Sequence, residues 1–328
     1  MNCCAPSLVS PPTQPSAQNG EARSALWSTA AALVLALIFS FYYLHHTFVM
    51  NEADPRLLAE FRGHRPYQAR VLMPVLIHFG VRWTTLDVAR CYQILLIGFS
   101  MGLFTVFKIY LGQFCAPRAA RWLALVLIWP LFAFYSHKWF YLYDVPAVFF
   151  ATLGLLLMAQ KRWKLYLLVF TLATLNRESS AFLVLACVLT SWKTVPRRAF
   201  LSILAAQIGI WLGVRALTMW LFAGNAGQSF ELHWAYNLAS ARQLLTSPWP
   251  LTLGSAIVTF VFLWVLGALT QRAQPDFLRR TRGVVWPFLA LMSVVGVMSE
   301  TRLYSELIPF LLAPALVGTF NVISQRLS

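Results

Sequence analysis

Residues 27–50 read WSTAAALVLALIFSFYYLHHTFVM, a run of 24 residues without a single Asp, Glu, Lys or Arg. A helix that spans a bilayer needs about 20 mainly apolar residues, so this run is long enough to cross one. It is longer than the apolar core of a secretory signal peptide, and no small-residue cleavage pattern follows it. We therefore expect residues 27–49 to form a helix that stays in the membrane.

The rest of the chain has the same character. Of the 328 residues, 59% are hydrophobic and 11% are charged, whereas roughly 25% are charged in an average soluble domain. Further long apolar runs cover 91–115, 199–222 and 251–270, and shorter ones cover 122–136, 140–159, 165–175, 180–192, 284–299 and 304–323. The sequence predicts one all-α polytopic membrane domain over 27–323, with about ten transmembrane helices that include short hairpins. Residues 1–26 are expected to be a disordered cytoplasmic N-terminus, and residues 324–328 a short cytoplasmic tail.

The positive charge is placed unevenly along a chain whose formal net charge is +15. Lys and Arg gather in short connections between apolar runs, at 118–121, 161–164, 193–198 and 272–282. A nucleic-acid-binding protein would present them along one polar face, so no nucleic acid partner is indicated. By the positive-inside bias these connections are cytoplasmic, and both termini lie on the same side. The five cysteines lack the spacing of a zinc site or a CxxC motif.

The basic clusters at 161–164 and 193–198 are joined by only 28 residues. If both clusters are cytoplasmic, the chain between them crosses an even number of times. Its apolar arms, 165–175 and 180–192, are too short for each to span a core of about 30 Å. The sequence predicts a short hairpin whose tip, Asn176-Arg177-Glu178-Ser179, stops within the membrane or in a cavity that opens outward. The alternative is one long tilted helix with an internal Arg177–Glu178 pair.

A second charged turn, Glu300-Thr-Arg302-Leu-Tyr-Ser-Glu306, separates two further apolar arms. Charged groups at membrane depth are costly and are normally paired or functional. The structural alternative here is a salt bridge from Arg302 to Glu306 at i and i+4. Asp144, in the segment YLYDVP, is another charged residue that we expect on the outer side of the membrane. A purely structural role is the alternative, in which Asp144 is a helix N-cap and Pro146 lies in the first turn.

The first outer loop contains Glu52 and Asp54 directly after the first helix. Asp54 followed by Pro55 is typical of an N-cap and a first helical residue. Apolar stripes at 57–61 and 71–79 indicate two amphipathic helices that lie in the outer interface. This arrangement would bring Asp54 and Arg70 toward a lipid head group.

The order of these features resembles the GT-C superfamily of polytopic glycosyltransferases, with the acidic stretch from Glu52 to Asp54 as the match at residue level. The segments 143–146, 176–178 and 300–306 also resemble a set found in bacterial membrane proteins of unassigned function. The resemblance implies a multi-pass protein of a bacterial inner membrane that takes a sugar from a polyprenyl-phosphate carrier on the non-cytoplasmic side. It also implies a first-loop carboxylate as catalytic base. The chain has fewer membrane segments than many members, which leaves the acceptor open and allows a non-catalytic descendant.

Sugar transfer from a lipid phosphate needs a base within reach of the acceptor proton, and cations that hold the phosphate as its charge develops. We expect Asp54 or Glu52 to be that base. Arg70, Arg177 and Arg302 would contact the phosphate, because a guanidinium fork matches its oxygens. The remaining acidic residues would orient the arginines or bind sugar hydroxyls: Asp144, Glu178, Glu300 and Glu306. No spacing calls for a cofactor or a metal ligand set, and a divalent cation among the carboxylates is left open.

Two other classes of function stay open at this level. Charged breaks in helices also mark the substrate sites of transporters, so a transporter of a small polar or anionic solute is the main alternative. In a transporter built from two inverted halves, corresponding breaks would point to opposite faces, whereas both charged tips here are expected to point outward. A non-catalytic subunit of an envelope-polysaccharide assembly system is the third interpretation, and it predicts that the charged tips tolerate substitution. The oligomeric state is not indicated.

Overall fold

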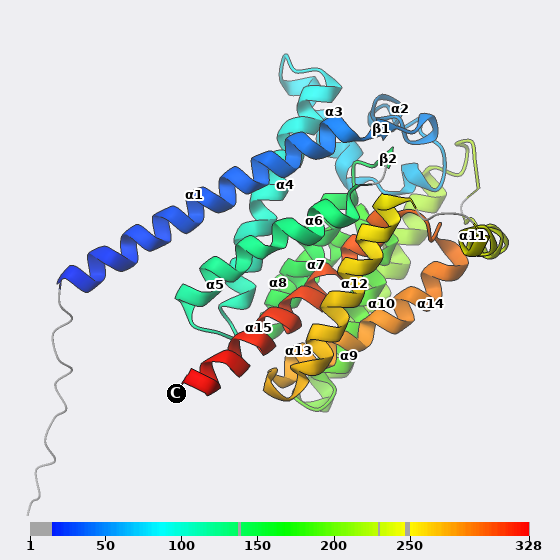
Figure 1. Cartoon of the computed structure of the whole chain (residues 1–328). Helices are drawn as coiled ribbons and strands as arrows, with labels where there is room; N and C mark the ends of the chain where they lie inside the picture. Colours follow the sequence, from blue (N-terminus) through cyan, green and yellow to red (C-terminus); the bar gives the residue numbers. More distant parts are fainter. Residues whose placement is uncertain (1–14, 137–138, 229, 247–249, 328) are drawn as a thin grey trace, which may run out of the picture.

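The computed structural model describes residues 15–136, 139–228, 230–246 and 250–327, and nearly all of its regular structure is helical (Figure 1). The helices longer than eight residues are α1 Pro15–His46, α3 Leu72–Trp83, α4 Val88–Leu111, α7 Asp144–Ala159, α8 Trp163–Asn176, α9 Ala181–Ser191, α10 Arg197–Leu221, α11 Trp234–Thr246, α12 Leu251–Leu269, α14 Val285–Val295 and α15 Ile308–Leu327. Shorter helices and turns are α2 Pro55–Ala59, α5 Pro117–Leu123, α6 Ile128–Phe134, α13 Asp276–Thr281, η1 Asn51–Ala53, η2 Tyr67–Ala69, η3 Ala124–Leu127, η4 Glu178–Ser180, η5 Gln271–Ala273, η6 Arg282–Val284 and η7 Thr301–Leu307. Two-residue strands, β1 Phe48–Val49 and β2 Trp139–Phe140, pair in parallel. The predicted all-α class is confirmed.

Six helical segments among the described residues are long and apolar enough to cross a bilayer. They are Gly20–His46, Val88–Leu111, Pro117–Phe134, Arg197–Leu221, Leu251–Leu269 and Thr301–Leu327. Shorter apolar helices, among them α7 and α8, accompany them. The chain is thus a multi-pass membrane protein that combines full-length spans with short helices, and six of the ten predicted segments reach spanning length.

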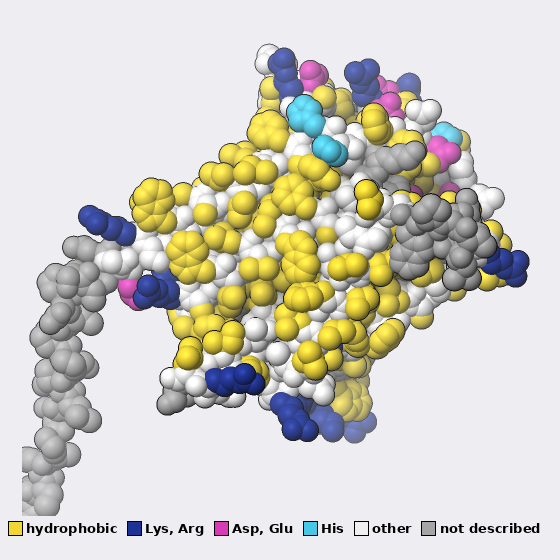
Figure 2. All heavy atoms as spheres, in the orientation of Figure 1, with side chains coloured by type: hydrophobic (Ala, Val, Ile, Leu, Met, Phe, Trp, Pro, Cys, Tyr) yellow, Lys and Arg dark blue, Asp and Glu magenta, His cyan; other side chains and the backbone are white. Residues whose placement is uncertain are grey.

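The short helix α7 lies at the centre of the bundle. Thirteen of its 16 residues are buried, and it packs closely against α4 and α8. In contrast, α10 buries only four of its 25 residues, although its composition is strongly apolar. An apolar surface of this extent is suited to lipid, and Figure 2 shows hydrophobic side chains over most of the flank of the molecule. The outer helices therefore face the bilayer, and α7 is enclosed by protein.

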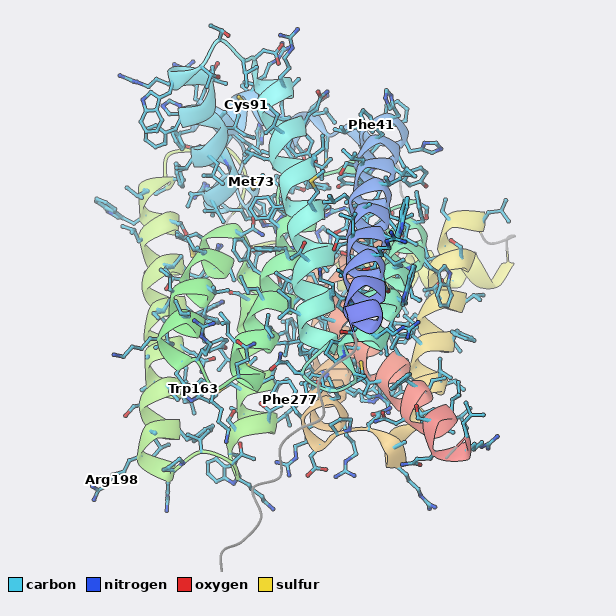
Figure 3. The ribbon with its side chains drawn as sticks, turned by 90° about the vertical axis from the view of Figure 1, so that its left-hand side faces the viewer. Phe41, Met73, Cys91, Trp163, Arg198 and Phe277 are labelled. Atoms are coloured by element: carbon cyan, nitrogen blue, oxygen red, sulfur yellow. The ribbon has the colours of Figure 1, made fainter. Side chains whose placement is uncertain are left out.

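The two ends of the bundle differ in charge. Arg198, at the start of α10, lies at the opposite end from Phe41 and Cys91 (Figure 3). Figure 2 shows Lys and Arg side chains along the lower and left edges, and acidic, basic and His side chains together along the upper edge. The basic connections thus gather at one end, as the sequence predicts. We refer to that end as the basic end and to the other as the mixed-charge end.

The first helix begins earlier than predicted. It starts at Pro15, so residues 15–26, which the sequence places in the N-terminal segment, are part of this helix, while residues 1–14 lie outside the described part of the chain. The segment from Ala17 to Ala25 is rich in Ala and also contains Gln18, Glu21 and Arg23. These are good helix formers, and they continue the helix beyond its apolar part. At the other end of the chain, α15 continues to Leu327 through most of the expected tail.

The chain between the basic clusters at 161–164 and 193–198 is broken in the middle, as predicted. Helix α8 ends at Asn176, and Arg177 has an extended backbone with φ −161° and ψ 142°. A single 3-10 turn, η4, then leads into α9. The alternative of one long tilted helix is therefore wrong, and Arg177 lies at the tip between two short helices.

The first outer loop contains both expected helices, α2 and α3. Leu58 of α2 is buried. In α3 the buried residues are Met73, Pro74 and Ile77, whereas Leu76 and Phe79 of the predicted apolar stripe are exposed. The predicted stripe is therefore the outward face of α3, which suits a helix in contact with the membrane interface.

Candidate functional site

Asp144, the first residue of α7, joins several separate segments at the mixed-charge end. Its carboxylate has no exposed surface. Arg177 donates to Oδ1 at 3.1 Å, and Arg302 donates to Oδ1 at 3.1 Å and to Oδ2 at 3.2 Å. The Tyr43 hydroxyl of α1 donates to Oδ2 at 3.3 Å. One carboxylate thus holds the tip that follows α8, the turn η7 and the first helix.

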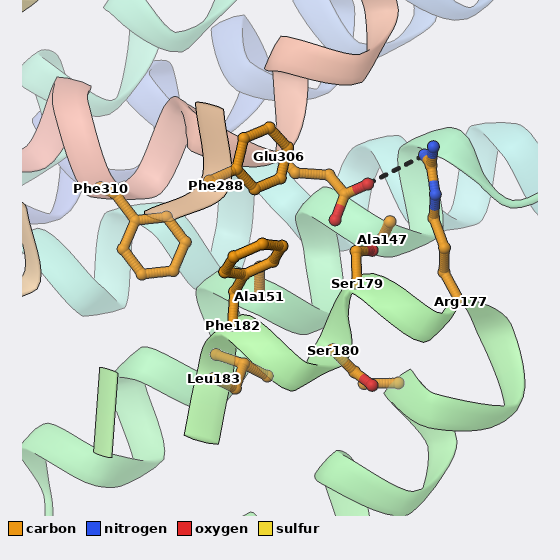
Figure 4. Close-up of a pocket in the computed structure, with 11 residues that line it drawn as sticks. Ala147, Ala151, Arg177, Ser179, Ser180, Phe182, Leu183, Phe288, Glu306 and Phe310 are labelled. Atoms are coloured by element: carbon orange, nitrogen blue, oxygen red, sulfur yellow. Dashed lines mark ion pairs between the residues drawn. The ribbon is translucent and has the colours of Figure 1, made fainter. Parts of the chain in front are cut away.

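Each arginine on Asp144 has a second acidic partner. Arg177 lies 2.9 Å from Oε1 of Glu306 (Figure 4). Arg302 pairs with Glu300. The alternative interpretations of these residues are both corrected. Arg302 pairs with Glu300 and Asp144 instead of Glu306, and the N-cap of α7 is Tyr143, because the Asp144 carboxylate is turned toward the arginines.

A second ion pair lies beside this group. Nε of Arg70 donates to Oε2 of Glu178 at 3.1 Å, and Nη2 donates to Oε1 at 2.5 Å, which is a bidentate contact. Arg215 of α10 lies 3.8 Å from the same carboxylate. Burial acts to lower the pKa of Arg70, but the charge of Glu178 outweighs it and holds that pKa above its ordinary value. Arg70 is therefore a fixed cation on the inner side of the first outer loop.

Two tyrosine rings connect the arginines. Cζ of Arg70 lies 4.2 Å from the ring centroid of Tyr143, and Cζ of Arg177 lies 5.5 Å from the same centroid. Cζ of Arg302 lies 3.6 Å from the centroid of Tyr141. A cation over an aromatic face is attracted by the ring quadrupole. The two ion-pair groups therefore form one continuous unit, which we call the arginine–carboxylate cluster: Arg70, Asp144, Arg177, Glu178, Arg215, Glu300, Arg302 and Glu306.

The cluster contains four arginines and four carboxylates, so its formal charge is 4 − 4, or zero. An added anion such as a phosphate must therefore take the place of a carboxylate on an arginine. The side chains of Glu178 and Glu300 are 37% and 16% exposed, whereas that of Asp144 is fully enclosed. Exchange is easiest at these two glutamates, because the others cannot leave without uncovering a buried charge.

Several polar atoms of cluster residues and of their chain neighbours have no hydrogen-bond partner within the described part of the chain. They are the hydroxyl of Tyr143, Oδ1 of Asn176 and Nε of Arg302, all fully buried. Buried polar groups are nearly always hydrogen-bonded in folded proteins, so an unpaired buried atom indicates a missing partner. These three provide two donors and an acceptor for a ligand or for ordered water.

The first-loop carboxylates lie outside the cluster. Oδ1 of Asp54 accepts a hydrogen bond from the backbone N–H of Arg56 at 2.8 Å, so Asp54 is the N-cap of α2. Glu52 is exposed. Among the described residues, no ion pair joins Glu52 or Asp54 to the cluster. A base in this loop would therefore act from above the cluster.

The loop itself starts directly at the cluster. The Tyr141 hydroxyl donates to Sδ of Met50 at 2.9 Å, and the ring of Tyr67 stacks on that of Tyr141 with centroids 5.5 Å apart. Tyr141 in turn covers Arg302. Met50, four residues before Asp54, is thus connected to Arg302 of the cluster through Tyr141.

Two members of this site were missed by the sequence analysis. Arg215 is the one charged residue within the apolar run 199–222, and a charge in such a run is a signal of function or pairing that was available. Tyr43 lies among apolar and aromatic residues of the first helix, and nothing in the sequence distinguishes it from Tyr42. Its contact with Asp144 is set by the packing of α1.

An apolar groove of about 240 Å³ opens beside the cluster. Apolar side chains of α6, α12 and α14 line it, among them Phe134, Phe260 and Leu289, and α11 adds Asn237, Ser240 and Ala241. Ser299 and Tyr304 also line it, and they flank Glu300 and Arg302 in the chain. The groove and the cluster are therefore adjacent in the chain through the segment 299–304.

No group of three or more His, Cys, Asp or Glu residues in the described ranges is arranged to hold a metal ion. No family model matches the chain, and neither the search of curated proteins nor that of solved structures gives a match.

Proposed function

We propose that this protein is a membrane-embedded glycosyltransferase that moves a sugar from a polyprenyl-phosphate carrier to an acceptor at the mixed-charge end. The observation that carries the proposal is the apolar groove whose lining residues Ser299 and Tyr304 flank Glu300 and Arg302 of the arginine–carboxylate cluster in the chain. A lipid phosphate has the same two parts, a long apolar chain and an anionic end. We also propose that the protein is of the GT-C type. In this proposal it lies in a bacterial inner membrane with both termini in the cytoplasm.

The chemistry assigns a role to each part. The lipid phosphate takes the place of Glu300 on Arg302, whose buried Nε has no partner among the described residues. An acceptor oxygen attacks the anomeric carbon, and the bond from that carbon to the phosphate oxygen breaks. The electron pair of that bond stays on the phosphate, where the arginine charge stabilises it. The acceptor proton goes to Asp54 or Glu52 in the loop above the cluster.

The convergence of the two charged tips favours chemistry over transport. Arg177 and Arg302 belong to different helix breaks, yet both donate to Asp144. In a transporter with inverted halves, corresponding breaks would come from opposite faces. Two breaks at one end of the bundle fit a site that is approached from one side.

Native mass spectrometry of the purified protein tests the proposal. We expect the wild-type protein to retain a polyprenyl-phosphate lipid, Arg302→Gln to lose it, and Arg279→Gln, a change in an exposed ion pair of α13, to keep it. Glu300→Gln is the sharper variant, because removal of the competing carboxylate should increase lipid retention, which misfolding cannot mimic. If the wild type retains no such lipid, or if Glu300→Gln and Arg302→Gln behave alike, the proposal is wrong.

A further inference from the structure

A crevice at the basic end of the bundle lies far from the cluster in the fold. It is formed where α1, α4 and α5 meet, and its polar lining consists of Ser28, Thr29, Thr105, Lys108 and Arg121. Its enclosed volume is about 10 Å³, so only a group about the size of a water molecule, such as one phosphate oxygen, fits at its base. The remainder of any ligand must lie outside, on the surface of these helices.

The two cations of the crevice have no acidic partner. All eleven Asp and Glu residues of the chain lie within the described ranges, and none of them forms an ion pair with Lys108 or Arg121. Nε of Arg121 is buried and has no hydrogen-bond partner in the described part of the chain. By comparison, Arg279 of α13, at the same end, pairs with Asp276.

Orientation in the membrane does not explain this geometry. A topogenic arginine acts through its charge alone and can stay in water, as exposed Arg118 does on the same helix. Arg121, three residues later, instead buries its Nε between helices. A buried donor without a partner carries a desolvation penalty, which an anionic ligand would remove.

The surroundings of the crevice place it at the level of lipid head groups. Trp27 precedes Ser28 on α1 and is 68% exposed, and Trp122 follows Arg121 on α5 and is 47% exposed. Exposed tryptophans are typical of the membrane–water interface. Basic pockets between helices at this level bind anionic lipid head groups.

We propose that Lys108 and Arg121 hold the phosphate of an anionic phospholipid between α1, α4 and α5. The site is independent of the sugar-transfer proposal, because it lies at the other end of the bundle and shares no residue with the cluster. The phosphate supplies the negative charge that pairs with both cations. It also supplies a hydrogen-bond acceptor for the buried Nε of Arg121.

Lipid titration followed by native mass spectrometry tests this inference. Detergent-purified protein would be titrated with phosphatidylglycerol and, separately, with phosphatidylcholine. Each cation near an anionic lipid contributes about 1 kcal/mol, so we expect about thirtyfold tighter binding of one phosphatidylglycerol. Lys108→Gln/Arg121→Gln should abolish this preference. Arg118→Gln/Lys164→Gln removes the same charge from exposed positions at this end and should keep it.

Two outcomes would overturn the inference. The first is an equal loss of the preference for phosphatidylglycerol in both double variants. That result would show that the preference comes from the total positive charge of this end and not from the crevice. The second is binding of inorganic phosphate by the wild-type protein as tight as that of phosphatidylglycerol, which would make the site a receptor for a free anion. If the protein unfolds in the Lys108/Arg121 variant, Arg121→Lys keeps the charge but removes the buried Nε, and it should weaken the preference without abolishing it.

Discussion

The carboxylate of Asp144 accepts hydrogen bonds from two arginines and a tyrosine and has no exposed surface. A buried charge is tolerated only when it is fully paired, and removal of one partner leaves the others uncompensated. Because its oxygens are occupied and closed to solvent, Asp144 is suited to hold the two tips in place and is poorly placed to exchange a proton with a substrate.

Asp144→Asn should therefore destabilise the protein by about 3 to 5 kcal/mol, because it leaves Arg177 and Arg302 with less compensating charge in the interior. Glu300→Gln, at a side chain that is 16% exposed, should cost clearly less. Reversible unfolding in mixed detergent micelles, followed by tryptophan fluorescence, would measure both. Equal effects of the two changes would contradict a special role for Asp144.

Asp54 has two possible roles, helix cap and general base, and an asparagine substitution separates them. Asn caps a helix about as well as Asp, so Asp54→Asn should leave the stability of the protein nearly unchanged. An amide cannot accept the acceptor proton, and loss of a general base costs about a hundredfold to ten-thousandfold in rate. We expect Asp54→Asn to keep the fold and the bound lipid but to lose sugar transfer, as measured by release of polyprenyl phosphate from a sugar-linked donor.

Glu52→Gln is the control for this experiment, because Glu52 is the exposed carboxylate nearest in sequence to Asp54. If Glu52→Gln loses transfer and Asp54→Asn keeps it, the base is Glu52. If both variants turn over normally, no first-loop base exists, and Glu178 becomes the next candidate because it is the most exposed carboxylate of the cluster.

At the scale of single elements, the two helix breaks are where the sequence was most informative. Arg177 lies between two apolar arms that are too short to span, Arg302 lies in the charged turn between two further arms, and charges at such places have to turn the chain or be paired. Both positions are breaks in the structure. Their pairing was not predictable, since Arg177 meets Glu306 across 129 positions of sequence, and local spacing carries no information on such a contact. The same limit hid Tyr43, and it favoured the local Arg302–Glu306 pair.

Helix ends were predicted less well than helices. The apolar run at 27–49 identified α1, but its start at Pro15 depends on helix-forming polar residues that hydrophobicity does not register. Helix α11 was missed, because Trp234–Thr246 mixes polar and apolar residues without a long apolar run. A pattern of apolar residues thus does not predict helices or helix ends that form through tertiary packing or through the helix propensity of polar residues.

The short hairpin makes a prediction about sidedness. Cysteines placed singly at Arg162, Lys193 and Arg279 should be labelled by a membrane-impermeant maleimide from the cytoplasmic side, and those at Glu60 and Ala235 from the opposite side. All five positions are exposed in the structure. Labelling of positions 162 and 193 from opposite faces would contradict the hairpin topology.

The native cysteines set the background of this measurement. Cys91 and Cys187 are buried, and burial raises the pKa of the Cys115 thiol to about 11. A higher pKa leaves less thiolate at neutral pH, so Cys115 should react slowly until the pH is raised well above neutral. Cys3 and Cys4 lie outside the described residues and would be replaced by serine.

At the scale of the whole molecule, the two ends of the bundle are built for different tasks. The basic end has cations without acidic partners, which suits contact with anionic lipid. The mixed-charge end contains a neutral, buried cluster beside an apolar groove. A solute pathway would need a polar route between the two ends, but α7, which begins at the cluster and runs through the bundle centre, is almost entirely apolar and buried. This arrangement supports the proposal of a site that is approached from one side.

A reconstituted system distinguishes enzyme from transporter for this one-sided site. In vesicles that contain a polyprenyl-phosphate-linked radioactive sugar and a membrane extract as the source of acceptor, the wild-type protein should release polyprenyl phosphate and label a covalent product. Arg302→Lys keeps the charge but loses the guanidinium fork on Asp144 and on the phosphate, so the rate should fall by about a hundredfold. Arg279→Lys, in the exposed pair of α13, should leave it unchanged.

Movement of labelled solute across the bilayer without a covalent product would instead identify a transporter. Full activity of Arg302→Lys would show that the cluster serves only to hold the helices together.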